Sequence, residues 1–122
     1  MGVPTDRLLE VAGVVSRLYD DRDLEAMHSL YRDDAVFTSP NPPNLTSFGT
    51  VIEGREQIFR YLNATMDFVP PGTVTTVALL GGIDMAVWVW QVESAGVRGA
   101  DVLFFDDEGL IAQHQVTAPH PG

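Results

Sequence analysis

The sequence predicts an α+β fold in which helices pack on one face of a curved antiparallel sheet. Helical periodicity is confined to the first half of the chain, and four β-prone runs separated by glycine-containing turns fill the second half. A chain of 122 residues, 45% of them hydrophobic, is long enough to bury one core, and no internal repeat or linker divides it. We therefore expect a single domain over residues 1–122.

Three helices are expected ahead of the sheet. The first begins at a cap on Thr5 or Asp6 and runs to about Tyr19, with apolar residues at helical spacing. The second follows a cap at Asp23, and the third covers residues 55–66. The apolar side of the second helix comprises Leu24, Met27, Leu30 and Tyr31.

The predicted strands are shorter and simpler in the first half than in the second. Residues 35–39 form a short strand, the proline-rich stretch 40–44 forms a loop that could act as a lid, and residues 50–54 are extended. Four longer strands follow over 73–80, 84–93, 97–105 and 110–118.

The last two predicted strands bring a carboxylic acid and an imidazole together. If Phe105 pairs with Leu110 across the acidic turn 106–109, then Asp101 lies directly opposite His114 on an otherwise apolar face. An isolated buried carboxylate is costly, so this pair is the strongest candidate for a functional site. Asp101 is interpreted either as a neutral acid or as a carboxylate that orients His114; the alternative is a core histidine without chemistry.

Two tryptophans give the clearest sign of a pocket wall. Trp88 and Trp90 alternate with smaller residues and therefore face the same way, together with Ala86 and Val92. They could form the floor of a ligand pocket or cover the outer face of the sheet in a dimer, and the pocket is favoured.

Composition excludes several classes of function. Seven basic and seventeen acidic residues give a net charge of −10, which repels nucleic acid and anionic membranes. The absence of cysteine excludes disulfides and thiolate chemistry, and three histidines at 28, 114 and 120 lack metal-site spacing. Without a signal-peptide pattern or a long apolar run, a cytoplasmic protein that uses no metal or cofactor is expected.

Four motifs resemble a known superfamily. They are Asp23-Leu24-Glu25, residues 31–37 (Tyr-Arg-Asp-Asp-Ala-Val-Phe), residues 53–58 (Glu-Gly-Arg-Glu-Gln-Ile) and residues 101–105 (Asp-Val-Leu-Phe-Phe). In this order they resemble the nuclear transport factor 2-like superfamily, and within it the ketosteroid isomerases and the SnoaL-like polyketide cyclases. The resemblance covers nearly the whole chain and implies a cone-shaped sheet, a cystatin-like α+β barrel, packed against three N-terminal helices.

The resemblance carries over only in part to single residues. Asp101 falls where ketosteroid isomerases keep a protonated oxyanion-hole aspartic acid, which is a worked example of pKa tuning. Ser39 stands at their general-base position and Val15 at their tyrosine position. His114 matches the histidine of the cyclases, whereas Val116 replaces their acid–base aspartate.

These observations predict a cofactor-independent isomerase or cyclase that acts on a hydrophobic carbonyl compound. His114 would move the proton, and Asp101 would orient it or donate to a developing oxyanion. We expect a homodimer whose pocket is lined by Val15, Tyr19, Phe37, Ser39, Phe59, Trp88, Trp90, Leu103 and Val116, with Asn41, Asn44 and Phe48 as weaker candidates in the loop.

Three alternatives remain open. The first is a non-catalytic binder of a hydrophobic small molecule, and the second is a protein-interaction module with a filled interior. The third is an epoxide hydrolase of the limonene epoxide hydrolase type, which shares the cone and uses an arginine and an aspartate two residues apart. Here Arg98 precedes Asp101 by three residues, which places the two on opposite faces of a regular strand.

Overall fold

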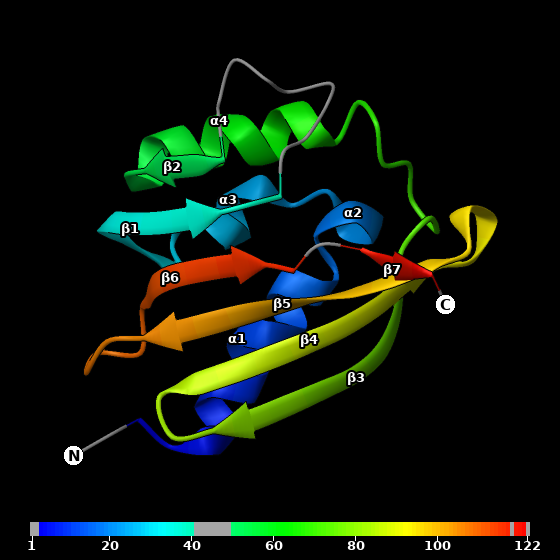
Figure 1. The fold of residues 1–122 in the computed structure, drawn as a ribbon. Helices are drawn as coiled ribbons and strands as arrows, with labels where there is room; N and C mark the ends of the chain where they lie inside the picture. Colours follow the sequence, from blue (N-terminus) through cyan, green and yellow to red (C-terminus); the bar gives the residue numbers. More distant parts are fainter. Residues whose placement is uncertain (1–2, 41–49, 118, 122) are drawn as a thin grey trace.

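A computed structural model describes residues 3–40, 50–117 and 119–121 and shows a curved, unclosed sheet with helices on its concave side (Figure 1). The strands are β1 (Tyr31–Thr38), β2 (Val51–Glu53), β3 (Thr75–Gly82), β4 (Met85–Val92), β5 (Val97–Phe105), β6 (Ile111–Val116) and β7 (His120–Pro121). The helices are α1 (Thr5–Ser16), α2 (Leu18–Asp21), α3 (Leu24–His28) and α4 (Arg55–Thr65), with a 3₁₀ turn at Glu93–Ala95.

The predicted fold class is confirmed, with one strand pairing that differs. The strand order is β2-β1-β6-β5-β4-β3, and β7 pairs with β5. All pairs are antiparallel except β1–β6, which is parallel and places Phe37 beside His114. Alternation along a strand tells which residues share a face but not which distant strand lies alongside, so the sequence could not predict this pairing.

The N-terminal helices differ from the prediction at their ends. The predicted first helix is divided at Arg17 into α1 and α2, and Pro4 rather than Thr5 or Asp6 occupies the cap position, with no side-chain hydrogen bond. Pro4 has φ −56° and ψ 140°, an extended conformation that proline adopts readily, and it precedes the helix, so its missing N–H costs no helical hydrogen bond. The cap at Asp23 is confirmed, since its Oδ1 accepts from the backbone N–H of Ala26 at 3.1 Å.

Strand β1 starts four residues earlier than predicted. Tyr31, assigned above to the apolar side of the second helix, is the first residue of β1 and pairs with Ile111. Asp33 and Asp34 are exposed on β1, between the paired residues Tyr31 and Val36, where its register with β6 shifts. The short strand β7 was not predicted.

The core lies between the helices and the concave face of the sheet. Helix α1 packs against β3 and β4, and α4 packs against β1 and α3. The largest fully buried side chains are Leu8, Val11, Val15, Met27, Tyr31, Ile58, Leu103, Ile111 and His114. Of the helices in the described part of the chain, none is both long and apolar enough to cross a membrane.

Candidate active site in the sheet cavity

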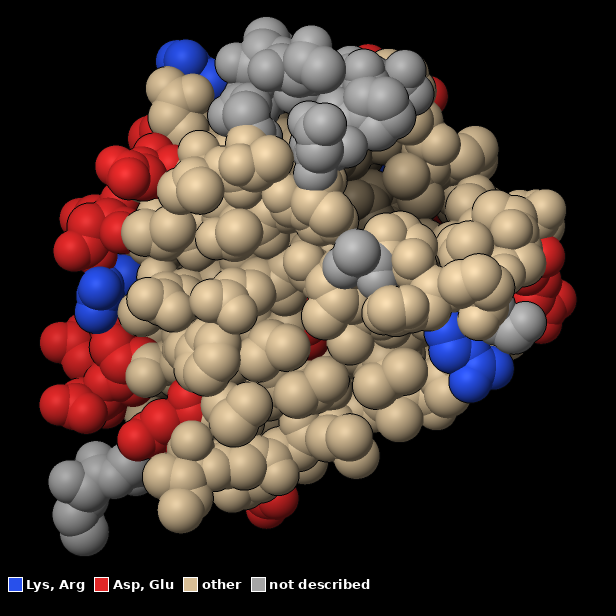
Figure 2. All heavy atoms as spheres, in the orientation of Figure 1, with Lys and Arg blue, Asp and Glu red and all other residues tan. Residues whose placement is uncertain are grey.

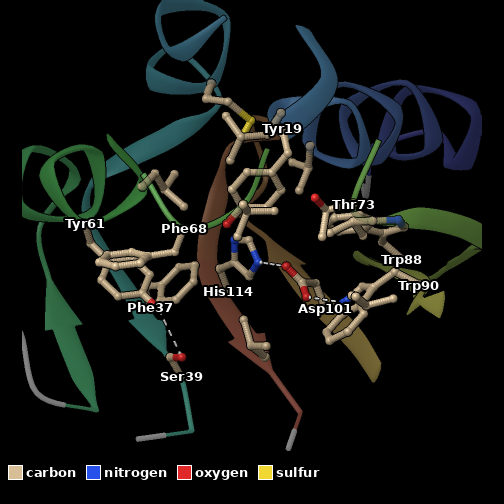
Figure 3. A pocket seen from close by; sticks show the side chains of 18 residues that line it. Tyr19, Phe37, Ser39, Tyr61, Phe68, Thr73, Trp88, Trp90, Asp101 and His114 are labelled. Carbon is tan, nitrogen blue, oxygen red and sulfur yellow. Dashed lines mark hydrogen bonds and ion pairs between the residues drawn. The ribbon is translucent and has the colours of Figure 1, made fainter. Parts of the chain in front are cut away.

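A cavity of about 350 Å³ opens between the helices and the concave face of the sheet (Figure 3). Most of its wall is hydrophobic, and Asp101 and His114 lie at its centre. The lining residues are Val15, Leu18, Tyr19, Met27, Phe37, Ser39, Tyr61, Leu62, Phe68, Val69, Thr73, Val74, Trp88, Trp90, Val92, Asp101, His114 and Val116.

The predicted contact between Asp101 and His114 is present, but the predicted register is wrong. His114 Nε2 lies 2.6 Å from Asp101 Oδ2, although Asp101 pairs with Val116 and His114 pairs with Leu103. A shift of two residues leaves every side chain on the same face, so the two groups still meet along a diagonal of the hairpin. The register changes between Phe104 and Phe105, next to the turn, where the pairing of β5 with β6 is irregular.

The pair belongs to a longer chain of hydrogen bonds that joins four neighbouring strands, β1, β6, β5 and β4. Tyr31 Oη lies 2.7 Å from His114 Nδ1, and Trp90 Nε1–H donates to Asp101 Oδ1 at 2.9 Å. Both ring nitrogens of His114 and both carboxyl oxygens of Asp101 are therefore occupied. His114 is 2% exposed and Asp101 is 7% exposed, so the protein rather than bulk water fixes their orientation.

Hydrogen-bond geometry assigns the protons in this chain. Burial, helped by the nearby Asp101 carboxylate, raises the pKa of Tyr31 well above its usual value, so the phenol keeps its proton. Among the described residues the hydroxyl of the buried Tyr31 is bonded to one group, His114 Nδ1. Because a buried O–H without an acceptor is costly, we infer that the hydroxyl donates to this nitrogen. His114 then carries its proton on Nε2 and donates it to Asp101, which favours a neutral histidine and an ionised carboxylate over the neutral-acid interpretation.

Two further phenols face the cavity. Tyr19 Oη donates to Thr65 Oγ1 at 3.0 Å, and burial raises the pKa of Tyr19 to about 12. Tyr61 Oη donates to Ser39 Oγ at 3.2 Å, and burial likewise raises the pKa of Tyr61. Both phenols therefore stay protonated at neutral pH, and either one donates to a ligand oxygen only by exchanging its bond to Thr65 or Ser39.

A glycine makes room for the indole that holds Asp101. Gly99 pairs directly with Trp90, and a Cβ atom at position 99 would lie 2.6 Å from Trp90 Cζ2. Any larger residue at this position would push the indole off β5 and break its bond to Asp101.

The structure places most of the predicted lining residues at the cavity. Phe59 and Leu103 are exceptions. The Phe59 ring packs edge-on against His28 at 5.2 Å between centroids, because α4 turns Ile58 and Leu62 inward instead. Leu103 faces inward as predicted but is completely buried in the core next to its partner His114. Asn41, Asn44 and Phe48 lie outside the described residues.

Sequence reasoning missed the residue that orients His114 and one side of the cavity. Tyr31 was assigned to a helix, and only the non-local pairing of β1 with β6 brings it to the imidazole. Phe68 and Val69 follow α4, and Thr73 and Val74, which the prediction placed in the strand 73–80, precede β3; none of the four was predicted to line the cavity. Tyr61 could have been found, since it neighbours Ile58 and Leu62 on the inward side of α4.

The structure also bears on metal binding and on the epoxide hydrolase alternative. The described residues contain no group of three His, Asp or Glu side chains that could hold a metal ion. Arg98 is exposed and pairs with Gln91 and His120 on the opposite face from Asp101, so an arginine–aspartate couple does not form at the cavity.

Comparison with solved structures shows the same fold in proteins of low sequence identity. A SnoaL-like protein of unknown function from Burkholderia thailandensis E264 superposes with a TM-score of 0.78 at 17% identity, covering 96% of this chain and 98% of that one. An NTF2-like protein of unknown function from Mesorhizobium loti gives 0.74 at 18% identity, covering 97% of each chain. A protein with a cystatin-like fold from Methylobium petroleophilum PM1 gives 0.72 at 18% identity, covering 96% and 78%.

Comparison with curated proteins gives no match. The family description "SnoaL-like domain", in contrast, matches residues 12–114, which include every strand from β1 to β5 and all four residues of the hydrogen-bond chain. The chain therefore belongs to the SnoaL-like domain family, which includes isomerases and cyclases.

Proposed function

We propose that the cavity binds a hydrophobic carbonyl compound and that Asp101 transfers a proton to and from the carbon next to the carbonyl group. The observation that carries this proposal is a carboxylate held in a mostly apolar cavity by two N–H donors, Trp90 and His114. Each carboxylate oxygen keeps a further lone pair for a substrate proton. Membership of a family with isomerases and cyclases supports the same class of chemistry.

The roles differ from those predicted from the sequence. His114 is nearly inaccessible and both its nitrogens are bonded, so it serves to position Asp101 and to stabilise its charge. Asp101 takes the proton from the substrate carbon, and the electron pair moves onto the carbonyl oxygen as an enolate. The hydroxyl of Tyr19 or Tyr61 exchanges its bond to Thr65 or Ser39 for a hydrogen bond to that oxygen. In an isomerisation Asp101 then delivers the proton to a different carbon of a conjugated enolate. In a ring closure the enolate carbon attacks a second carbonyl group of the substrate, and Asp101 delivers the proton to the alkoxide that forms.

The test is hydrogen exchange in a panel of hydrophobic ketones dissolved in deuterated buffer. We expect the protein to catalyse loss of the proton signal next to the carbonyl, measured by NMR, in at least one ketone that fits the cavity. The Asp107→Asn variant removes a carboxylate from the exposed β5–β6 turn and should exchange the ketone as fast as the wild type. Ketones that bind in the cavity but exchange no faster than in buffer would contradict the proposal.

A second candidate function, binding without catalysis, is favoured by a specific observation. Every polar atom of the Asp101–His114 pair already has a partner within the protein, so the site needs no substrate to satisfy it. A ligand that raises the melting temperature and is recovered chemically unchanged would support this function.

We also propose that the predicted homodimer forms through the convex face of the sheet, which no helix covers (Figure 1). Direct pairing places Leu80, Val87 and Val102 together on this face, and Figure 2 shows charged atoms gathered at its margins. Because the acidic groups lie away from the centre of this face, two copies with a charge of −10 can approach with these groups apart. The six strands are 3 to 9 residues long and offer roughly 600 Å², close to the ~800 Å² per partner of a standard interface.

Sedimentation and light scattering test this interface. Val102→Glu should weaken dimerisation at least about tenfold, because it places two like charges in an apolar contact. Ile83→Glu is the matched control, since Ile83 lies in the turn between β3 and β4 and should leave the dimer intact. A wild-type monomer at high concentration, or a Val102→Glu dimer of unchanged strength, would contradict the proposal.

A further inference from the structure

Among the described residues, no arginine lies beside the carboxylate of Asp101. The residues that line the cavity include no arginine, and the sequence contains no lysine. The salt-bridge partner of Asp101 in the described part of the chain is His114, which the hydrogen-bond geometry assigns as neutral. The buried negative charge is therefore stabilised by two N–H donors and by no opposite charge. The approach of a cation to this carboxylate is favourable for that reason.

The wall around this carboxylate is aromatic. Six rings line the cavity, those of Tyr19, Phe37, Tyr61, Phe68, Trp88 and Trp90. The rings of Trp88 and Trp90 lie 6.4 Å apart and are inclined at 53°, and Trp90 also bonds to Asp101. Figure 3 shows Trp88 and Trp90 on one side of Asp101, and Tyr61 and Phe37 on the far side of His114. Ring faces attract an ammonium group, most strongly when water is excluded.

We propose that this cavity binds hydrophobic amines as ammonium or quaternary ammonium cations, with the positive charge beside Asp101 and the apolar part among the aromatic rings. The proposal rests on the cavity being a ligand site, as in the proposed function, but not on turnover. The net charge of −10 also raises the local concentration of cations around the protein. A hydrophobic amine would compete with a carbonyl compound for the same carboxylate.

The test compares ligands of one shape and different charge. Benzyltrimethylammonium is the cation, neopentylbenzene is its neutral isostere, and 3-phenylpropionate is an anion of similar size. Binding is followed by quenching of tryptophan fluorescence, because both tryptophans of the chain line the cavity. We expect the cation to bind at least about tenfold more tightly than the neutral isostere, and the anion to bind most weakly.

Two variants distinguish the effect of the Asp101 carboxylate on cation binding from the effect of the net charge of the protein. Asp101→Asn keeps the aromatic rings but removes the negative charge, so its preference for the cation over the neutral isostere should fall at least about fivefold. Asp107→Asn carries the same change in net charge at an exposed position and should keep the wild-type preference for the cation. Equal binding of the two ligands by the wild type, or an unchanged preference in Asp101→Asn, would overturn the proposal.

A measurement on the wild-type protein covers the case in which Asp101→Asn does not fold. The two indole N–H groups give separate NMR signals. The N–H of Trp90 donates to Asp101, and the N–H of Trp88 donates to Thr76. The cation should shift the Trp90 signal more than the Trp88 signal, and a larger shift at Trp88 would overturn the proposal. If the protein catalyses hydrogen exchange in ketones but does not prefer the cation over its neutral isostere, only the present inference is overturned. If it prefers the cation but catalyses no exchange, the present inference stands and the proposed catalysis is contradicted.

Discussion

Replacing Asp101 by asparagine is expected to lower turnover of a confirmed carbonyl substrate about a thousandfold, within the range that a positioned acid–base group contributes. The affinity for an uncharged ligand should stay within about tenfold of the wild type, because the amide has nearly the same size and the apolar walls are untouched. A loss in kcat without an equal change in binding is the result that distinguishes a proton-transferring group from one that only holds the ligand.

The Asp101→Asn substitution also changes the direction of the hydrogen bonds in the chain. The amide oxygen can still accept from Trp90 Nε1–H at the Oδ1 position. The amide NH₂ then points at His114 Nε2, so the imidazole must move its proton to Nδ1 and Tyr31 must accept instead of donate. The NMR signals of the His114 ring nitrogens should therefore report a change of tautomer in Asp101→Asn.

The measurement is steady-state kinetics beside calorimetric binding of a neutral ligand. Asp107→Asn serves as control, because it removes a carboxylate from the exposed β5–β6 turn and should keep both kcat and affinity. A kcat within about threefold of the wild type in Asp101→Asn would remove Asp101 from the chemistry, since that change is below the contribution of any general base.

The fold class and the contact between Asp101 and His114 could be predicted from the sequence even though the predicted hairpin register was wrong. The hairpin register was wrong by two residues, but the face of a strand repeats every two residues, so the pair still faces inward. An error of one residue would have turned one of the two groups away from the cavity. The tryptophans Trp88 and Trp90 were placed on the cavity side by the same two-residue repeat.

The part of the site that the sequence could not predict depends on non-local contacts. Tyr31 fits the helical spacing of Leu24 and Met27, and only the parallel pairing of β1 with β6, about eighty positions away in sequence, assigns it to a strand beside His114. Leu103 shows the converse limit, because an inward direction does not tell whether a side chain meets a cavity or fills the core.

The second large effect is a loss of stability in alkali that the three tyrosines cause together. The chain has no cysteine and no lysine, and arginine stays protonated, so the tyrosines are the side chains that titrate between pH 9 and 12. Burial raises the pKa of Tyr19, Tyr31 and Tyr61 in the folded protein. A raised folded-state pKa means that this stability is fully present below the unfolded value of about 10 and is lost as the pH rises through the folded value.

The expected loss is a large share of the stability of a typical domain. For Tyr19, whose pKa is raised to about 12, the slope is as much as about 1.4 kcal/mol per pH unit above pH 10 and the total reaches as much as about 3 kcal/mol. Tyr31 and Tyr61 add to this loss in the same direction, because burial raises the pKa of both. Urea unfolding from pH 8 to 11.5, with tyrosinate absorbance followed in parallel, measures this loss.

Tyr31→Phe identifies the part of the alkaline loss that belongs to the hydrogen-bond chain. At pH 8 this variant should be less stable by about 1–2 kcal/mol, because His114 Nδ1 loses its donor. Above pH 10 its stability should fall less steeply than that of the wild type, so the two curves converge as the pH rises. Tyr19→Phe is the comparison variant, with the same smaller slope but with His114 still bonded to Tyr31. Parallel curves for Tyr31→Phe and the wild type, or tyrosinate formation in the folded protein at pH 10, would contradict a buried phenol that donates to His114.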